Sequence, residues 1–283
     1  MDEQKLTELL HEDVSSVKSL GGGCIANTRL VKTASGRQLV VKESAMPGMA
    51  LNEANSLREL KKADAIRVPD VIFADARVLI IEYISPGGKR RWFFEDFGRQ
   101  LAQMHRHSQV AFGWIEDNYI GTTPQLNKAV GDEVLHWTDF YFNKRLLFQY
   151  HLAERNGYVT DTFKQLFRRL EARLPEILKG SEEPPALLHG DLWGGNYLVD
   201  ESGQPVLIDP AVYYGHREAE LAMTRLFGGF SEDFYRAYSE EWPLPDGADY
   251  RQGVYTLYHV MNHLNMFGAG YLSQTISLMQ QYV

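Results

Sequence analysis

Three polar residues in the second half of the chain have the types and the spacing that phosphoryl transfer needs. Asp191 and Asn196 lie five positions apart in the glycine-rich segment HGDLWGGN, and Asp209 ends the apolar run PVLID 13 positions further on. An aspartate can orient and deprotonate an attacking hydroxyl group, and an amide oxygen together with a second carboxylate suits Mg²⁺. A folded core has little use for such a polar loop between two apolar runs. The pattern therefore predicts Asp191 as a catalytic base and Asn196 and Asp209 as magnesium ligands.

Candidate nucleotide-binding residues precede this loop. Gly21, Gly22 and Gly23 form a triplet whose backbone N–H groups could approach phosphate oxygens closely. Lys42, in the apolar run LVVKES, can neutralise phosphate charge if a carboxylate such as Glu53 holds it in place. Each signal alone also has a purely structural explanation. The glycines could form only a hairpin, Lys42 could be a solvated residue of a strand, and Glu53 an exposed charge on a helix. Their joint order, however, is that of the kinase template, which runs from a glycine loop through lysine and glutamate to Asp-x-x-x-x-Asn and a final aspartate. The order predicts ATP binding, with Lys42 and Glu53 in the catalytic centre.

The elements that would position these residues separate into two parts at the segment SPGGKRR, residues 85–91. Residues 1–84 contain short apolar runs with turn residues between them and one helical pattern at 48–63. Residues 85–283 are typical of helices, with short strands around the Asp191 loop. An antiparallel, β-rich N-terminal lobe followed by a mostly helical C-terminal lobe is an α+β fold, and we expect the site where the two lobes meet.

The connection between the two lobes is formed by Glu82, Tyr83 and Ile84. Backbone groups in this connection are where the adenine of a nucleotide would bind. The N-terminal lobe is therefore expected to bind nucleotide, and the C-terminal lobe to hold the catalytic and substrate-binding residues.

Composition excludes several other classes of protein. The 283-residue chain has a formal net charge of −8 and a pI of about 5.6, with basic residues scattered along it. A nucleic-acid or anionic-membrane partner is therefore not expected. No apolar run reaches the roughly 18 residues that a membrane-spanning helix needs, and the N-terminal stretch lacks a signal-peptide pattern. We expect a cytoplasmic globular protein.

Over residues 5–280 the chain resembles the fructosamine kinase (ketosamine-3-kinase) family, within the wider aminoglycoside-phosphotransferase-like group. The motifs HGDLWGGN and DPAVYYGHRE carry most of this resemblance, with support from GGGCIANT, LFGGF and LYHVMNHLNMFGAGY. The resemblance implies a protein-kinase-like two-lobed fold with ATP and Mg²⁺ as cofactors. It also implies phosphorylation of a sugar hydroxyl, expected at the 3-position, on a free or protein-bound ketosamine such as a fructosamine or ribulosamine. In this family the 3-phosphate product is unstable and sheds the sugar, so the activity is a deglycation repair. Glu220 departs from the aspartate of many relatives in the wider group, and its longer side chain must be accommodated if it braces the catalytic loop.

Candidates for the substrate-binding residues are less sharply defined. Trp193 lies inside the catalytic loop and could cover the C–H face of a sugar, although packing beneath the loop is an equal alternative. A histidine on an apolar helix face is more often a core residue with its hydrogen bonds satisfied than a ligand. The main further candidates are Asp139, His216, Glu218 and His263, and the others are Asn118, Gln125, Asn127, Trp137 and Asn262.

Other functions remain open at this point. A kinase for aminoglycosides or choline on the same fold would need an acidic cluster for its cationic substrate. A non-catalytic nucleotide-binding module would be free to lose some of the five kinase residues, yet all are present. A protein kinase is disfavoured because Asp209 runs almost directly into helical sequence, with no activation loop or Ala-Pro-Glu segment.

Cys24 is the single cysteine and follows the glycine triplet directly. Loop N–H groups could favour its thiolate, which would make the enzyme redox-sensitive through a small thiol or a disulfide-linked homodimer. The alternative is a cysteine that only fills a small apolar site.

Overall fold

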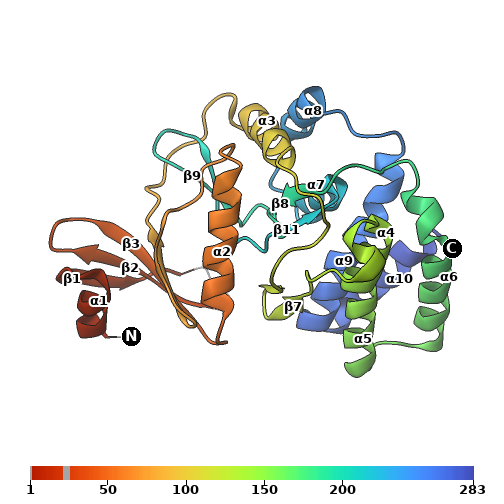
Figure 1. Cartoon of the computed structure of the whole chain (residues 1–283), viewed down its shortest axis with the longest axis horizontal. Coiled ribbons are helices and arrows are strands. Elements are labelled where there is room, and N and C mark those ends of the chain that lie inside the picture. Colours follow the sequence, from red (N-terminus) through yellow and green to blue (C-terminus); the bar gives the residue numbers. More distant parts are fainter. Residues whose placement is uncertain (1, 22–25) are drawn as a thin grey trace.

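The computed structural model describes residues 2–21 and 26–283. Their N-terminal part is a five-stranded antiparallel sheet in the order β1-β2-β3-β5-β4. Figure 1 shows this sheet at one end of the molecule, with helix α1 packed on it and helix α2 standing between the sheet and the helical part. The elements are α1 (Glu3–Leu10), β1 (Val14–Ser19), β2 (Ala26–Thr33), β3 (Gln38–Ser44), α2 (Met49–Lys62), β4 (Val71–Ala74) and β5 (Val78–Glu82).

Alternation along β3 decides where Lys42 points. Leu39 and Val41 are buried on the face of the sheet that carries α1, because strand side chains alternate between the two faces. Lys42 therefore projects toward the other face, where it is paired in register with Leu79 of β5. Leu79 packs against Leu57 of α2 in a second apolar cluster. The sheet thus presents Lys42 to the helix that carries Glu53.

The C-terminal part is mostly helical, and three short antiparallel strand pairs, β6–β7, β8–β11 and β9–β10, accompany its helices. The α+β fold expected from the sequence is confirmed (Figure 1). Its elements are α3 (Phe93–His105), β6 (Asn118–Ile120), β7 (Thr123–Gln125), the 3₁₀ turn η1 (Gly131–Val134), α4 (Trp137–Tyr141), the π-helical turn η2 (Phe142–Leu147), α5 (Phe148–Arg155), α6 (Asp161–Leu178), β8 (Ala186–Leu188), β9 (Tyr197–Val199), β10 (Pro205–Leu207), β11 (Tyr213–Gly215), α7 (Arg217–Leu226), α8 (Glu232–Glu241), α9 (Ala248–Phe267), the 3₁₀ turn η3 (Ala269–Tyr271) and α10 (Leu272–Gln280).

Polar contacts fix helix α2 to the C-terminal part. The Tyr214 hydroxyl donates to the Glu59 carboxylate at 2.9 Å, and Asn55 Nδ2 donates to the Glu116 carboxylate at 2.9 Å. Because both contacts lie on the helix that carries Glu53, they hold that side chain in a defined place relative to the C-terminal elements.

A backbone contact also joins the two parts. Arg67 lies between α2 and β4 and forms a parallel bridge with Val206 of β10, and the Leu207 N–H donates to the Arg67 carbonyl at 3.0 Å. The predicted lobe boundary, 85–91, falls between β5 and α3. Among residues 2–21 and 26–283, no helix has the length and apolar character to cross a membrane.

Candidate active site

The loop between β8 and β9 carries the predicted catalytic base. Asn196 Nδ2 donates to the Asp191 backbone carbonyl at 2.7 Å and to a carboxylate oxygen of the same residue at 3.1 Å. Burial raises the pKa of Asp191 to about 8, and the nearby charges of Asp209 and Glu220 act in the same direction, against the hydrogen bond from Asn196. A carboxylate with such a pKa is suited to accept a proton near neutral pH.

A buried carboxylate on α7 braces this loop. Glu220 accepts hydrogen bonds from the backbone N–H groups of Gly190 at 2.7 Å and His189 at 3.1 Å. Its third partner is His105 Nε2 at 2.8 Å, and the other ring nitrogen of His105 bonds the Tyr238 hydroxyl. Burial opposes ionisation of Glu220, but these hydrogen bonds and the charge of His105 hold its pKa below the usual value. The longer side chain is thus accommodated, and the sequence alone did not identify His105 as its support.

The loop also contacts the segment that carries Asp209. His189 is buried, and its Nε2–H donates a hydrogen bond to the Ile208 carbonyl at 2.8 Å. Ala211 N–H donates to the His189 carbonyl at 2.8 Å. Gly190 has φ +84°, and a Cβ there would lie 1.9 Å from the Ala211 carbonyl oxygen. Both its conformation and its close approach therefore require glycine at position 190.

Three elements bring Lys42, Glu53 and Asp209 together. The Lys42 ammonium lies 2.6 Å from the Glu53 carboxylate of α2 and also contacts the carboxylate of Asp209, which follows β10. Burial disfavours the charge on Lys42, but the two carboxylates more than compensate and raise its pKa. In turn, the charge and hydrogen bond of Lys42 hold the pKa of Asp209 below its usual value, although the surrounding protein partly desolvates the carboxylate. The structure thus joins the predicted nucleotide-binding lysine to the predicted metal ligand.

The donor set beside this cluster fits Mg²⁺. Asn196 uses its Nδ2 to hold Asp191, which leaves its amide oxygen as the group that could face a cation. Asp209 adds a carboxylate whose side chain is 49% exposed, at φ +55°. Within the described residues there is no group of three or more His, Cys, Asp or Glu side chains placed to hold a metal. Few protein oxygens, completed by phosphate oxygens and water, are the usual ligands of Mg²⁺ in kinases.

In the connection between the lobes, Glu82–Ile84, two backbone N–H groups already donate hydrogen bonds within the protein. Glu82 N–H donates to the Asp70 carbonyl at 2.9 Å, and Tyr83 N–H donates to the Gln38 carbonyl at 3.4 Å. The Glu82 carboxylate accepts a hydrogen bond from Arg67 at 2.6 Å. Any adenine contact in Glu82–Ile84 would therefore use other backbone groups. Of the predicted glycine loop, Gly21 follows β1, and a Cβ there would meet nothing within 4 Å; Gly22, Gly23 and Cys24 lie outside the described residues.

Two of the predicted substrate residues lie together beside the catalytic loop. Trp193 is 39% exposed, and its ring lies against Gly195 and 6.2 Å from the Phe227 ring. The same Phe227 ring lies 4.8 Å from the His263 ring of α9. Phe227 thus links the two candidates, although the sequence analysis did not single it out.

Three other substrate candidates are engaged in contacts of their own. His216 is buried and bonds the Ser181 carbonyl. Asp139 is exposed on α4 and lies 3.8 Å from His136. The two carboxylate oxygens of Glu218 accept hydrogen bonds from Arg251 at 2.7 and 2.6 Å. These contacts give each of the three a partner within the protein, and their assignment to the substrate site stays a prediction from the sequence.

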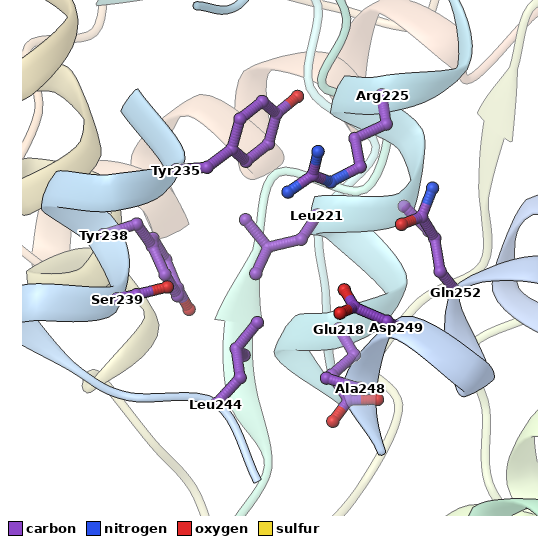
Figure 2. A pocket seen from close by; sticks show the side chains of 11 residues that line it. Glu218, Leu221, Arg225, Tyr235, Tyr238, Ser239, Leu244, Ala248, Asp249 and Gln252 are labelled. Atoms are coloured by element: carbon purple, nitrogen blue, oxygen red, sulfur yellow. The ribbon is translucent and has the colours of Figure 1, made fainter. Parts of the chain in front are cut away.

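Figure 2 shows the pocket beside Glu218, between α7, α8 and the first turn of α9. The Arg225 guanidinium lies 3.6 Å from the Tyr235 ring centre at one side of it. The pocket has a volume of about 40 Å³, which would hold only a few water molecules. It opens on a face of α7 different from the one that presents Glu220 to the catalytic loop, so it is too small and wrongly placed for a sugar.

Two of the remaining candidates contact the segment that follows Asp209. Asn118 Nδ2 donates to the Val212 carbonyl at 2.7 Å, and Gln125 Nε2 donates to the Ala211 carbonyl at 2.8 Å. These bonds fix the backbone of residues 211 and 212 and give both amides a positioning role. The other three have similar internal partners: Asn127 with Arg145, Trp137 with Tyr255, and Asn262 with Gln149.

Arg145 is a buried cation that the sequence analysis missed. It lies in the π-helical turn η2, and its guanidinium is 4.1 Å from the centre of the Tyr213 ring. It donates to the carbonyl of Leu126 and to Asn127 Oδ1 at 2.8 Å. An arginine in the apolar pattern WTDFYFNKRLLFQY was the available signal. Its contacts fix the β7 end against β11.

Comparison with known proteins agrees with this geometry. The family model described as "Fructosamine kinase" matches residues 2–283. A protein-ribulosamine 3-kinase, chloroplastic, of Arabidopsis thaliana is 37% identical over 98% of this chain and 86% of its own length. A probable ketoamine kinase of Enterococcus faecium is 36% identical over 92% of this chain and 93% of its own.

Solved structures support the same assignment. A putative fructosamine-3-kinase from Thermobifida fusca has a TM-score of 0.88 at 33% identity and covers 99% of this chain and 97% of its own. An aminoglycoside phosphotransferase, APH(2'')-Ib, has a TM-score of 0.64 at 14% identity, with 98% and 96% covered, so that this similarity concerns the fold alone. The fold is therefore the one shared by aminoglycoside phosphotransferases. The chain belongs to the fructosamine kinase family.

Proposed function

We propose that this chain transfers the γ-phosphoryl group of ATP to the 3-hydroxyl group of a ketosamine, such as a ribulosamine or fructosamine. The family match over residues 2–283 is the single observation that carries the substrate class. The reaction forms a bond between the sugar oxygen and phosphorus and breaks the bond to the ADP oxygen. The product is a ketosamine 3-phosphate, whose decomposition frees the amine, so the activity is of the deglycation type.

The residues around the catalytic loop would divide the work as follows. Asp191, in its ionised form, accepts the proton of the attacking hydroxyl, and the burial that raises its pKa to about 8 makes that form a stronger base. Lys42, held by Glu53, neutralises phosphate charge. Asn196 and Asp209 would hold Mg²⁺, which when bound offsets the charge on the phosphates. Glu220 keeps Asp191 in place through the preceding backbone N–H groups.

We further propose that residues 1–84 form the nucleotide-binding lobe and residues 85–283 the catalytic and substrate lobe. The contacts of Lys42 with both Glu53 and Asp209 support this division, because they join the proposed phosphate-binding residue of the first part to the proposed metal ligand of the second. Trp193 and His263 would cover the sugar on the C-terminal side. A cytoplasmic location and a redox role of Cys24 stay predictions from the sequence.

The test is ATP turnover with a panel of acceptors. Fructosamine, ribulosamine and erythrulosamine derivatives of lysine are compared, with an aminoglycoside as the control. ADP release and the ³¹P spectrum of the product are measured, and Asp191→Asn provides the inactive enzyme. Phosphate at the 3-position of at least one ketosamine is expected. Turnover of the aminoglycoside alone would instead identify a different small-molecule kinase.

A further inference from the structure

Arg145 is a fully buried arginine whose hydrogen-bond acceptors, among the described residues, are all uncharged. Two other buried arginines of the C-terminal part each form a bidentate ion pair, Arg217 with Glu183 and Arg251 with Glu218. A guanidinium keeps its charge inside a protein, and burial of a charge without a counter-charge opposes folding. Stability alone therefore does not explain the presence of Arg145.

Aromatic rings and uncharged oxygens surround the guanidinium. Its Cζ lies 4.1 Å from the centre of the Tyr213 ring and 5.0 Å from that of Phe140. It donates to the Leu126 carbonyl and to Asn127 Oδ1 at 2.8 Å, while its Nε has no partner in the part of the chain that the structure describes. A planar guanidinium donates in fixed directions and stacks on aromatic faces. One side chain thus fixes two elements, β11 through Tyr213 and the end of β7 through Leu126 and Asn127.

The first of these elements leads directly to the catalytic loop. Tyr213 is paired in register with Leu188 of β8, the residue before His189. The Tyr213 ring also reaches the loop itself, because a Cβ on Gly190 would lie 3.4 Å from its Cδ1. Gly190 immediately precedes Asp191 in the chain. A shift of the Tyr213 ring would therefore move the backbone that carries Asp191.

The second element reaches the same point from β7. Gln125 ends β7, and its Nε2 donates to the Ala211 carbonyl at 2.8 Å. The same carbonyl oxygen lies against Gly190, since a Cβ there would be only 1.9 Å away. Ala211 N–H in turn donates to the His189 carbonyl at 2.8 Å. Both sets of contacts that start at Arg145 consequently end at the backbone just before the catalytic base.

We propose that Arg145 is a positioning residue for Asp191. Because it is fully buried, it acts without touching substrate, by fixing Tyr213 and the end of β7. The turn that carries it, η2, is π-helical, a rare geometry that is frequent at functional sites. This inference rests on the proposed function, in which Asp191 is the base, and adds to it a residue behind the catalytic loop.

The test separates turnover from stability. Arg145→Met keeps the length of the side chain and removes its charge, and it should lower kcat about 10- to 100-fold, the order of effect that misplacing a reacting group by about 1 Å gives. KM for ATP should change little, because Lys42 and Glu53 pair with each other in the N-terminal part. Arg145→Lys keeps the charge but not the planar fork, so it should recover part of kcat. It also provides the test if Arg145→Met does not fold.

Gln149→Met is the matched control. Gln149 is a fully buried polar residue at the start of α5, and it bonds Asn262 and Asn265 of α9. Its loss should lower the melting temperature and leave kcat unchanged, with every kcat measured well below the melting temperature of the variant.

A double variant tests the route through Tyr213. Tyr213→Leu should also lower kcat. Combined with Arg145→Met it should lower kcat no further than Arg145→Met alone, because residues that act through one another are not additive.

Three results would overturn this inference and leave the proposed function intact. They are a wild-type kcat in the Arg145 variants, an equal loss of kcat in Gln149→Met, and a double variant whose loss is the product of the two single losses. A wild-type enzyme that phosphorylates no ketosamine would instead overturn the proposed function and, with it, this inference.

Discussion

Glu220 accepts a hydrogen bond from the backbone N–H of Gly190, the residue directly before Asp191, at 2.7 Å. The carboxylate is buried, and its other partners are His189 N–H and His105. Glu220→Ala would leave these buried donors without an acceptor, which costs about 2–5 kcal/mol. We expect a lower melting temperature together with a loss of kcat that exceeds any change in KM for ATP, measured by thermal unfolding and steady-state kinetics.

Glu220→Asp is the informative companion variant. Its shorter carboxylate can still accept from the loop, so it should recover part of kcat. If Glu220→Ala loses stability but retains the wild-type kcat, Glu220 supports the core and does not position Asp191.

Asp191→Asn should lower kcat about 10²- to 10⁴-fold, because a positioned general base contributes about that much. Binding of ATP should change little. In the wild type, kcat/KM should rise with pH through about 8, since the base acts only when deprotonated and burial raises its pKa to about 8. A variant with most of the wild-type activity would exclude Asp191 as the base.

The same substitution should have a pH-dependent effect on stability. The pKa of Asp191 is about 8 in the folded chain, against an ordinary value of 3.8, so the folded state binds more protons between these limits. The wild type therefore loses stability as pH rises from about 4 to about 8, and Asp191→Asn does not share this loss. Measured at pH 5, 7 and 9, the melting temperature of the variant should increase relative to that of the wild type as pH rises. A constant difference between pH 5 and pH 9 would contradict the raised pKa of Asp191 in the folded chain.

Asp209→Ala should abolish the dependence of nucleotide affinity on Mg²⁺. The carboxylate supplies one of the two proposed protein ligands, and the phosphates would lose their bridging cation without it. Lys42 would also lose one of its two carboxylate partners. Calorimetry of ATP binding with and without Mg²⁺ measures this effect, and an unchanged response to Mg²⁺ in the variant would remove Asp209 from the metal site.

The kinase-like cluster could be predicted from the sequence, whereas most substrate contacts could not. The order of motifs predicts the pairing of Lys42 with Glu53 and a shared site with Asp209, because it is the order of the kinase template; the direct contact of Lys42 with Asp209 comes from the structure. A polar residue on a helix, by contrast, has the same local pattern whether its partner is a ligand or a buried side chain. Glu218 pairs with Arg251, and only the tertiary structure identifies that partner. Phe227 has no polar group, and the only signal for its segment was the motif LFGGF, which supports the family resemblance but does not place the ring beside Trp193.

Arg67 joins the connection between the lobes to the strand pair that separates the two proposed metal ligands. Its guanidinium lies 2.6 Å from Glu82 and 2.8 Å from Asp200, the residue that follows β9. Asp200 is buried; although burial opposes ionisation, hydrogen bonds from Gln204, Ser202 and Arg67 hold its pKa at about 2. Because β9 starts after Asn196 and β10 ends before Asp209, Arg67 ties the spacing of the two proposed ligands to the proposed nucleotide-binding lobe.

Arg67→Ala should therefore raise KM for ATP about 2- to 10-fold, the effect of losing about 0.5–1.5 kcal/mol of hydrogen bonding, and leave KM for the ketosamine unchanged. Arg67→Lys should recover part of the difference, since an ammonium can pair with one of the two carboxylates. Lys61→Ala is the matched control: Lys61 forms an exposed ion pair with Asp70 close by but does not reach Asp200. If Arg67 links the two lobes as proposed, its loss affects KM for ATP alone. Equal changes in KM for ATP and for the ketosamine, or the same change in Lys61→Ala, would instead show that Arg67 contributes only to general stability.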